Sequence, residues 1–290
     1  MNGARSCSRC CFSSRCLINA YPLTLEFTLA LTPFMEPDAP LFYLSNPVPL
    51  SLLTMPLTQL FPHAQSITAV VLAGGQGTRM GGVDKGLQHF QGQAMAQRAL
   101  LRVAPWVGTV AVNANRNETA YQAFCDAIWP DPDLSAWGGM GDGVSWGPLA
   151  GFLTALQHVQ TPFLLTVPCD CPFFPLDLVL RLSQAMGQSG ADLVMPRVPI
   201  GREGRQRLAT QPVFALMRVH VLKSLEIFMA QGGRKVLDWS QSLHHAFVDF
   251  DQAHDEAHAF SNINTLSELT HWNTASPPGP KSSPCARPSA

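Results

Sequence analysis

Apolar residues between about positions 67 and 272 fall into short runs separated by polar or glycine-containing segments. Residues 67–73 read ITAVVLA, a β-branched run followed by glycine, and this pattern predicts a buried strand and a turn. Three further runs of strand length follow it: residues 109–113 (TVAVN), 163–167 (FLLTV, stopped by Pro168) and 192–195 (DLVM).

Segments with helical spacing of apolar residues lie between these runs, at residues 94–103, 118–125 and 176–186. Strands that alternate with helices indicate right-handed crossovers and a mostly parallel sheet covered on both faces. We therefore predict an α/β domain of three layers. Residues 208–216 and 246–250 predict strands at or near an edge.

A last helix is predicted after residue 265. Thr265-Leu-Ser-Glu268 is a capping-box pattern, in which the two side chains satisfy each other's backbone amides at a helix start.

The two ends of the chain lack this organisation. Prolines interrupt the apolar runs of the first 66 residues, and residues 276–290 are rich in proline and serine. We predict a disordered or wrongly assigned extension at 1–66, one folded domain at 67–273 and a disordered tail at 274–290. The start of the native protein is predicted near Met55. Four crowded cysteines in the extension do not have the spacing of a zinc site: Cys7, Cys10, Cys11 and Cys16.

Composition narrows the class of protein. Of the 290 residues, 46% are hydrophobic and 13% are charged, and 19 Lys and Arg against 20 Asp and Glu give a net charge of −1. Bulk neutralisation of nucleic-acid phosphates is not expected from this balance. No apolar stretch of about 18 residues is free of charge and proline, so no membrane span is predicted. An enzyme or a small-ligand binder remains.

A glycine-rich segment follows the first strand, LAGGQGTRMGGVDKG at residues 72–86. Glycines let backbone N–H groups approach an anion closely, and Arg79 and Lys85 add positive charge where a triphosphate would lie. We interpret the segment as a phosphate-binding loop rather than a flexible turn. It is not a Walker A loop, because Asp84 precedes Lys85 and no Ser or Thr follows. It also lacks the third glycine of the dinucleotide fingerprint.

Polar residues follow the other predicted strands. Asn113 suits the edge of a base through its donors and acceptor, or it forms an Asx turn or cap. Asp131 follows a short apolar stretch, where an isolated aspartate is more often a turn or cap residue. Asn262 and Asn264 lie before the last helix; Asn264 either caps that helix or faces the site.

Asp170 follows the strand at 163–167, within PCDCP. A carboxylate at the end of a buried strand is a good oxygen ligand for Mg²⁺, and capping of the next helix is the competing interpretation. Cys169 and Cys171 are too close together for a CxxC motif, which makes a redox or metal pair unfavourable.

Together these segments resemble the molybdenum cofactor guanylyltransferases, and the resemblance spans about residues 67–272. The matching motifs, in chain order, are LAGGQGTRMGGVDKGL (72–87), VNANR (112–116), GPLAG (147–151), PCDCP (168–172) and NINT (262–265). The GTRLxPLT pattern typical of sugar nucleotidyltransferases is absent.

The resemblance implies a Rossmann-like nucleotidyltransferase fold and the transfer of GMP from GTP to the molybdenum-molybdopterin cofactor, with release of pyrophosphate. It implies a magnesium-dependent cytoplasmic enzyme. Its partners would be GTP, molybdenum-molybdopterin, and molybdenum-insertion proteins or molybdoenzyme chaperones, without nucleic acid or membrane. The alternatives are a cytidylyltransferase for the same cofactor, a sugar-type nucleotidyltransferase, and a non-catalytic nucleotide or cofactor carrier.

Carried over position by position, the resemblance implies three roles for the motif residues. Catalysis would rest on Arg79, Lys85 and Asp170, with Asp170 as the ligand of Mg²⁺. Nucleotide binding would involve Leu72, Ala73, Gly74, Gly75, Lys85, Asn113, Asp131, Asp170, Asn262 and Asn264.

Two features extend or weaken the match. A Gly- and Trp-rich insert at residues 131–146 is longer than the usual family link, and it borders the nucleotide site as a candidate lid. Cations at 201–207 and 234–235 are candidates for the pterin phosphate by analogy with the family.

Overall fold

A computed structural model describes residues 62–75, 82–135, 146–201, 207–252, 254–256 and 258–274. Every described residue lies within the unit of residues 42–290. The predictions for the N-terminal extension, its cysteines, Arg79, the insert interior at 136–145 and the C-terminal tail lie outside the described residues.

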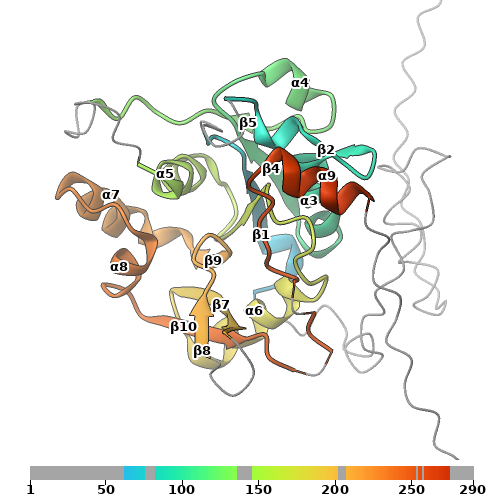
Figure 1. The fold of residues 1–290 in the computed structure, drawn as a ribbon. Coiled ribbons are helices and arrows are strands. Elements are labelled where there is room, and N and C mark those ends of the chain that lie inside the picture. Colours follow the sequence, from blue (N-terminus) through green and yellow to red (C-terminus); the bar gives the residue numbers. More distant parts are fainter. Residues whose placement is uncertain are drawn as a thin grey trace, which may run out of the picture. The chain divides into compact units, whose positions relative to one another are not determined.

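The described residues form an eight-stranded sheet in the order β10-β7-β9-β6-β1-β4-β5, with β8 paired to β7 (Figure 1). All neighbouring strands are parallel except at β8 and β9, so the mostly parallel sheet is confirmed. The strands are β1 (Ile67–Leu72), β4 (Thr109–Asn113), β5 (Ile128–Trp129), β6 (Phe163–Pro168), β7 (Leu193–Ile200), β8 (Arg207–Thr210), β9 (Ala215–Arg218) and β10 (His245–Asp249), beside a small hairpin of β2 (His89–Phe90) and β3 (Gln93–Ala94).

Helices occupy the connections between the strands. They are α3 (Met95–Val103), α4 (Glu118–Gln122), α5 (Pro148–His158), α6 (Leu178–Ser189), α7 (Leu222–Ala230), α8 (Val236–Ser240) and α9 (Leu266–Thr274), with short 3-10 turns η3 (Ala64–Ser66), η5 (Lys85–Leu87), η6 (Ala104–Trp106) and η8 (Val219–Val221). Among the described residues, none of these helices combines the length and the apolarity needed to cross a membrane.

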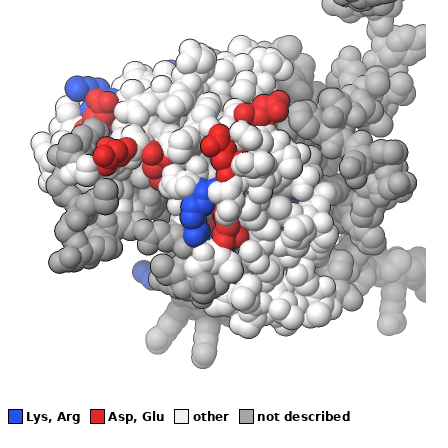
Figure 2. Space-filling model, turned by 90° about the horizontal axis from the view of Figure 1, so that it is seen from above, with Lys and Arg blue, Asp and Glu red and all other residues white. Residues whose placement is uncertain are grey.

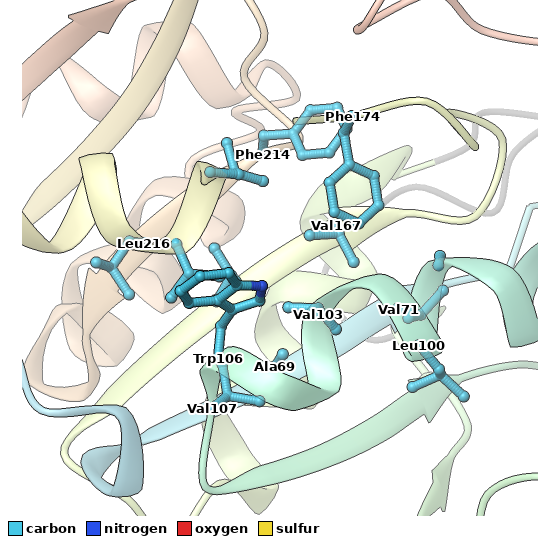
Figure 3. Packing of buried hydrophobic residues seen from close by; sticks show 14 of the residues in the cluster. Ala69, Val71, Leu100, Val103, Trp106, Val107, Val167, Phe174, Phe214 and Leu216 are labelled. Carbon is cyan, nitrogen blue, oxygen red and sulfur yellow. The ribbon is translucent and has the colours of Figure 1, made fainter. Parts of the chain in front are cut away.

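Two separate hydrophobic clusters cover the two faces of the sheet, which confirms the three layers. Ile67, Ala69 and Val71 of β1 point to the cluster that α3 and α6 cover. Val70 points to the opposite cluster, covered by α5, α7 and α8. Figure 3 shows the first cluster, where Trp106 packs beside strand residues. β1 is therefore buried on both faces, which explains its continuous apolar sequence.

The strand predicted at 208–216 is corrected by the structure. The segment forms two strands, β8 and β9, separated by a turn in which the Phe214 amide donates to the Gln211 carbonyl at 3.1 Å. Pro212 in this turn has no N–H for a sheet ladder. β9 lies inside the sheet between β6 and β7, so the predicted edge position is wrong for it, whereas β10 is an edge strand as predicted.

The predicted capping box is confirmed. The Thr265 hydroxyl accepts a hydrogen bond from the Glu268 amide at 3.1 Å, and the Glu268 carboxylate accepts from the Thr265 amide at 3.2 Å. The Glu268 carboxylate also accepts from the Asn264 amide at 2.6 Å. These bonds fix the start of α9 directly after the NINT motif.

Candidate active site

The polar motifs meet at one edge of the sheet, where the parallel strands β6, β1, β4 and β5 end. Leu72 at the end of β1 pairs with Asn113 of β4 and with Pro168 of β6, and Asn113 pairs with Trp129 of β5. The residues that follow these strands are therefore brought side by side. Ligands of open α/β sheets bind beyond such strand ends.

One cluster is centred on the carboxylate of Asp131. Its Oδ1 accepts from Asn113 Nδ2 at 2.8 Å and from the Thr154 hydroxyl at 3.0 Å. Its Oδ2 accepts from Asn115 Nδ2 at 2.7 Å, while Asn115 Oδ1 accepts from the Asp131 amide at 2.7 Å. These donors fix the orientation of the carboxylate.

Asn113 is almost fully buried, with 2% of its surface exposed. Its Nδ2 donates to the Trp129 carbonyl at 2.9 Å as well as to Asp131, so both amide hydrogens are engaged. Its Oδ1 faces Gly74 and Gly151, because Cβ atoms added there would lie 3.0 and 2.7 Å from this oxygen. Asn113 thus orients Asp131, and its side-chain oxygen keeps its capacity to accept a hydrogen bond.

Gly151 in the GPLAG motif lets α5 approach Asn113 closely. We expect Gly151→Ala to lower the free energy of unfolding by about 1–3 kcal/mol, because the added methyl overlaps Asn113 Oδ1 and lies 2.9 Å from a methyl of Leu72. Denaturant unfolding measures this loss. Gly187→Ala, at an exposed position of α6, is the control and should be neutral or stabilising. Equal stability of both variants would contradict the tight fit at Gly151.

A second cluster joins Lys85 to the residues after β6 and before α9. Lys85 Nζ donates to Asp170 Oδ2 at 2.7 Å and to Asn264 Oδ1 at 2.9 Å. The side chains of Lys85 and Asp170 are each 18% exposed. The side chain of Asn264 therefore faces the site, and Thr265 takes the capping role that the sequence left open for Asn264.

The NINT and PCDCP motifs are joined by two further bonds. The Ile263 amide donates to the Asp170 carbonyl at 2.8 Å, and the Cys171 thiol donates to Asn262 Oδ1 at 2.7 Å. Burial raises the pKa of Cys171 and of Cys169 far above that of an exposed thiol, so both remain protonated. A reactive thiolate at either position is therefore disfavoured in the metal-free protein. Asp170 does not cap α6, whose first residue is Leu178.

The chemistry of the donor set decides whether Mg²⁺ fits. Among the described residues, no group of three or more His, Cys, Asp or Glu side chains could hold a metal on its own. Mg²⁺ commonly binds through one or two carboxylates together with substrate phosphates and water. Asp170, beside the oxygens of the NINT asparagines, fits such a site for a metal that arrives with a triphosphate.

The stems of the glycine-rich loop are described, whereas residues 76–81 are not. The Ala73 amide donates to the Asn113 carbonyl at 2.8 Å, and the Leu72 carbonyl accepts from the Cys169 amide at 3.2 Å. The Gly74 carbonyl accepts from Asn115 Nδ2 at 3.1 Å. These bonds extend the sheet into the loop and hold the first stem between the two clusters.

Sequence reasoning assigned no role to Asn115 and Thr154. Asn115 carried a signal, because it belongs to VNANR, whereas Thr154 lies inside α5 at a position without a motif. Figure 2 shows a mostly uncharged face with scattered acidic side chains, some of which lie beside basic side chains.

The model of the MobA-like NTP transferase domain matches residues 69–246. The chain belongs to this family. Proteins named molybdenum cofactor guanylyltransferase from Acidovorax sp. (strain JS42) and Albidiferax ferrireducens are 52% and 50% identical over 205 and 209 residues. These alignments cover 70% and 71% of this chain and 93% and 95% of the relatives.

Two solved structures of nucleotidyltransferase type share the fold. Molybdopterin-guanine dinucleotide biosynthesis protein A from Archaeoglobus fulgidus is 22% identical, with a TM-score of 0.52 over 71% of this chain and 96% of that one. CMP:2-keto-3-deoxy-manno-octonic acid synthetase, solved with CTP, is 14% identical, with a TM-score of 0.54 over 71% and 95%. At these identities the likeness establishes the Rossmann-like nucleotidyltransferase fold alone.

Proposed function

We propose that this protein transfers GMP from GTP to the molybdenum-molybdopterin cofactor and forms molybdopterin guanine dinucleotide and pyrophosphate. The relatives that bear the name of this activity, at 47–52% identity over most of their length, support the proposal. The observation that carries it is the contact of Lys85 with Asp170 and Asn264, which brings three motifs together beside the Asp131 cluster.

The reaction needs little covalent chemistry from the protein. The terminal phosphate of the pterin is already anionic, so it attacks the α-phosphorus of GTP in line with the leaving pyrophosphate without a general base. The protein positions the two substrates and neutralises charge on the triphosphate. Lys85 supplies one positive charge, and Arg79 supplies another from the loop between the two stems. Mg²⁺, held by Asp170 and the phosphate oxygens, would add further neutralisation when bound.

The Asp131 cluster is the proposed site for the nucleoside. Guanine presents neighbouring N–H donors on one edge, and the Asp131 carboxylate and Asn113 Oδ1 are acceptors. The side chains of Asn113, Asn115 and Thr154 donate hydrogen bonds to the Asp131 carboxylate and hold it in place. Leu72, Ala73, Gly74 and Gly75 would contact the nucleotide through the backbone.

We propose that molybdenum-molybdopterin, which accepts the GMP, binds near the NINT motif and the cations at 234–235. Asn262 and Asn264 border the Lys85–Asp170 pair and would complete the cleft toward the pterin. The Arg234 guanidinium lies 3.2 Å from the centroid of the Trp146 ring, and Lys235 is exposed. The contact with the Trp146 ring holds the Arg234 guanidinium in place, and we propose that this cation binds the pterin phosphate.

Base preference tests the function. We expect GTP with Mg²⁺ to raise the melting temperature, and CTP and ATP to have little effect. A ligand at 100 times its dissociation constant stabilises the folded state by about 2.7 kcal/mol, which thermal unfolding detects readily. Pyrophosphate release with molybdenum-molybdopterin then separates the enzyme from a carrier. Stronger stabilisation by CTP would favour the cytidylyltransferase, and GTP binding without pyrophosphate release would favour the carrier.

The domain boundaries at 67–273, the cytoplasmic location, and the insertion or chaperone proteins as partners remain predictions. The family match and the coverage of the relatives support the extent of the domain.

A further inference from the structure

The segment that follows β4 bonds to both stems of the glycine-rich loop. Asn115 Nδ2 donates to the Gly74 carbonyl at 3.1 Å. Arg116 reaches both sides, because its Nη2 donates to the Gly75 carbonyl at 3.4 Å and its Nη1 to the Gly82 carbonyl at 3.0 Å. One guanidinium thus ties the residue before the undescribed stretch 76–81 to the residue after it.

The same segment fixes the residue that precedes Lys85. Asp84 Oδ2 accepts from Asn117 Nδ2 at 3.0 Å, and Asp84 Oδ1 accepts from the Tyr121 hydroxyl at 2.6 Å. Asp84 Oδ1 also accepts from the Gly86 amide at 3.2 Å, which caps the η5 turn that begins at Lys85. The orientation of Asp84 therefore sets the backbone from which the Lys85 side chain extends.

Local backbone and packing make this arrangement rigid. Asn117 has φ 54° and ψ 34°, a left-handed conformation that is uncommon outside glycine and costs free energy, and it turns the chain into α4. Tyr121 is fully buried in the core cluster, and its hydroxyl emerges at Asp84. A Cβ on Gly86 would overlap this hydroxyl, so the glycine gives the tyrosine its access. Burial and the bond to Asp84 raise the pKa of Tyr121, which keeps the hydroxyl a donor.

We propose that residues 115–121, which we call the clamp segment, preset both stems of the loop and Lys85 for a triphosphate, with Arg116 and Tyr121 as positioning residues. The inference rests on the proposed function only in the choice of GTP as ligand. The clamp acts on the phosphate half of the site. Loss of the bonds made by Arg116 or Tyr121 should weaken contacts to the triphosphate and leave contacts to the nucleoside unchanged. Asn115 also bonds to Asp131 and is therefore not varied in the test.

Tyr121→Phe and Arg116→Met test the clamp, because each removes the hydrogen-bond donors and keeps much of the apolar side chain. Gln122→Ala is the matched control at the end of α4, where the Gln122 side chain donates to the Glu118 carboxylate. We expect the affinity for GTP to fall about tenfold in each clamp variant, the loss expected for a hydrogen bond to a charged or well-placed group. The affinity for guanosine should stay within about twofold, and the control should match the wild type.

Amide exchange of the ligand-free full-length protein provides a second measurement. The peptide that covers residues 82–88 should exchange several-fold faster in the clamp variants, while peptides from β4 and α5 keep their rates. Equal losses for GTP and guanosine would show general damage and overturn the clamp, as would unchanged exchange at 82–88.

The two proposals fail separately. If the wild type prefers another nucleoside triphosphate, the guanylyltransferase proposal is wrong. The affinities of the clamp variants are then measured for that triphosphate and for the corresponding nucleoside. If no triphosphate binds, exchange at residues 82–88 alone decides: faster exchange in both variants supports the clamp, and unchanged exchange overturns it.

Discussion

Asp170→Asn is expected to lower the turnover of GTP and molybdenum-molybdopterin by at least about 100-fold while the domain stays folded. The amide keeps the size of the side chain and an acceptor oxygen for Lys85, which lies 2.7 Å from the carboxylate. The amide loses the negative charge that would hold Mg²⁺ against the triphosphate. Removing one group that stabilises the transition state typically lowers turnover by about 100-fold or more. Steady-state pyrophosphate release as a function of Mg²⁺ concentration measures the effect.

The Mg²⁺ titration separates a metal ligand from a structural residue. The variant should need far more Mg²⁺ for its residual rate, and its melting temperature should stay within about 4 °C of the wild type, which is about 1 kcal/mol for a domain of this size. Asp126→Asn is the control, because Asp126 is exposed and should leave the rate unchanged. Near-normal turnover of Asp170→Asn at low Mg²⁺ would remove Asp170 from the metal role.

The sequence predicts that the polar residues of these motifs lie together, because they follow the ends of neighbouring strands. Residues 67–73 and 109–113 are apolar runs whose polar residues come directly after them, and parallel strands place those residues at one edge. Lys85, Asp170 and Asn264 are far apart in the chain, so their direct contact could only be expected from the family resemblance. The structure supplies the distances of 2.7 and 2.9 Å that make them one cluster.

The interior position of β9 and the clamp segment could not be predicted from local pattern. β9 is a short apolar strand after a turn, and nothing in Ala215–Arg218 specifies which strands it pairs with. In the clamp segment, Tyr121 follows the period of a helix and is indistinguishable from a core residue, which its ring indeed is. Its second role depends on a hydroxyl that reaches Asp84, a partner 37 residues away in the chain.

Removal of the Lys85 charge is the second large effect that we expect. Lys85→Met should lower kcat/KM for GTP about 100- to 1000-fold, because one donor to the triphosphate is lost and the Asp170 carboxylate then faces the phosphates without its cation. Lys223→Met, at a side chain that is 78% exposed, is the matched control and should have no effect.

Coupling between Lys85 and Asp170 is the decisive feature of this prediction. In the Lys85→Met background, Asp170→Asn should cost much less than it does in the wild type, because it also removes the repulsion between a carboxylate and the triphosphate. The double variant should therefore be far more active than the product of the two single losses. A double-mutant cycle on kcat/KM measures this, and additive losses would mean that the two side chains act on the nucleotide independently, despite their contact in the structure.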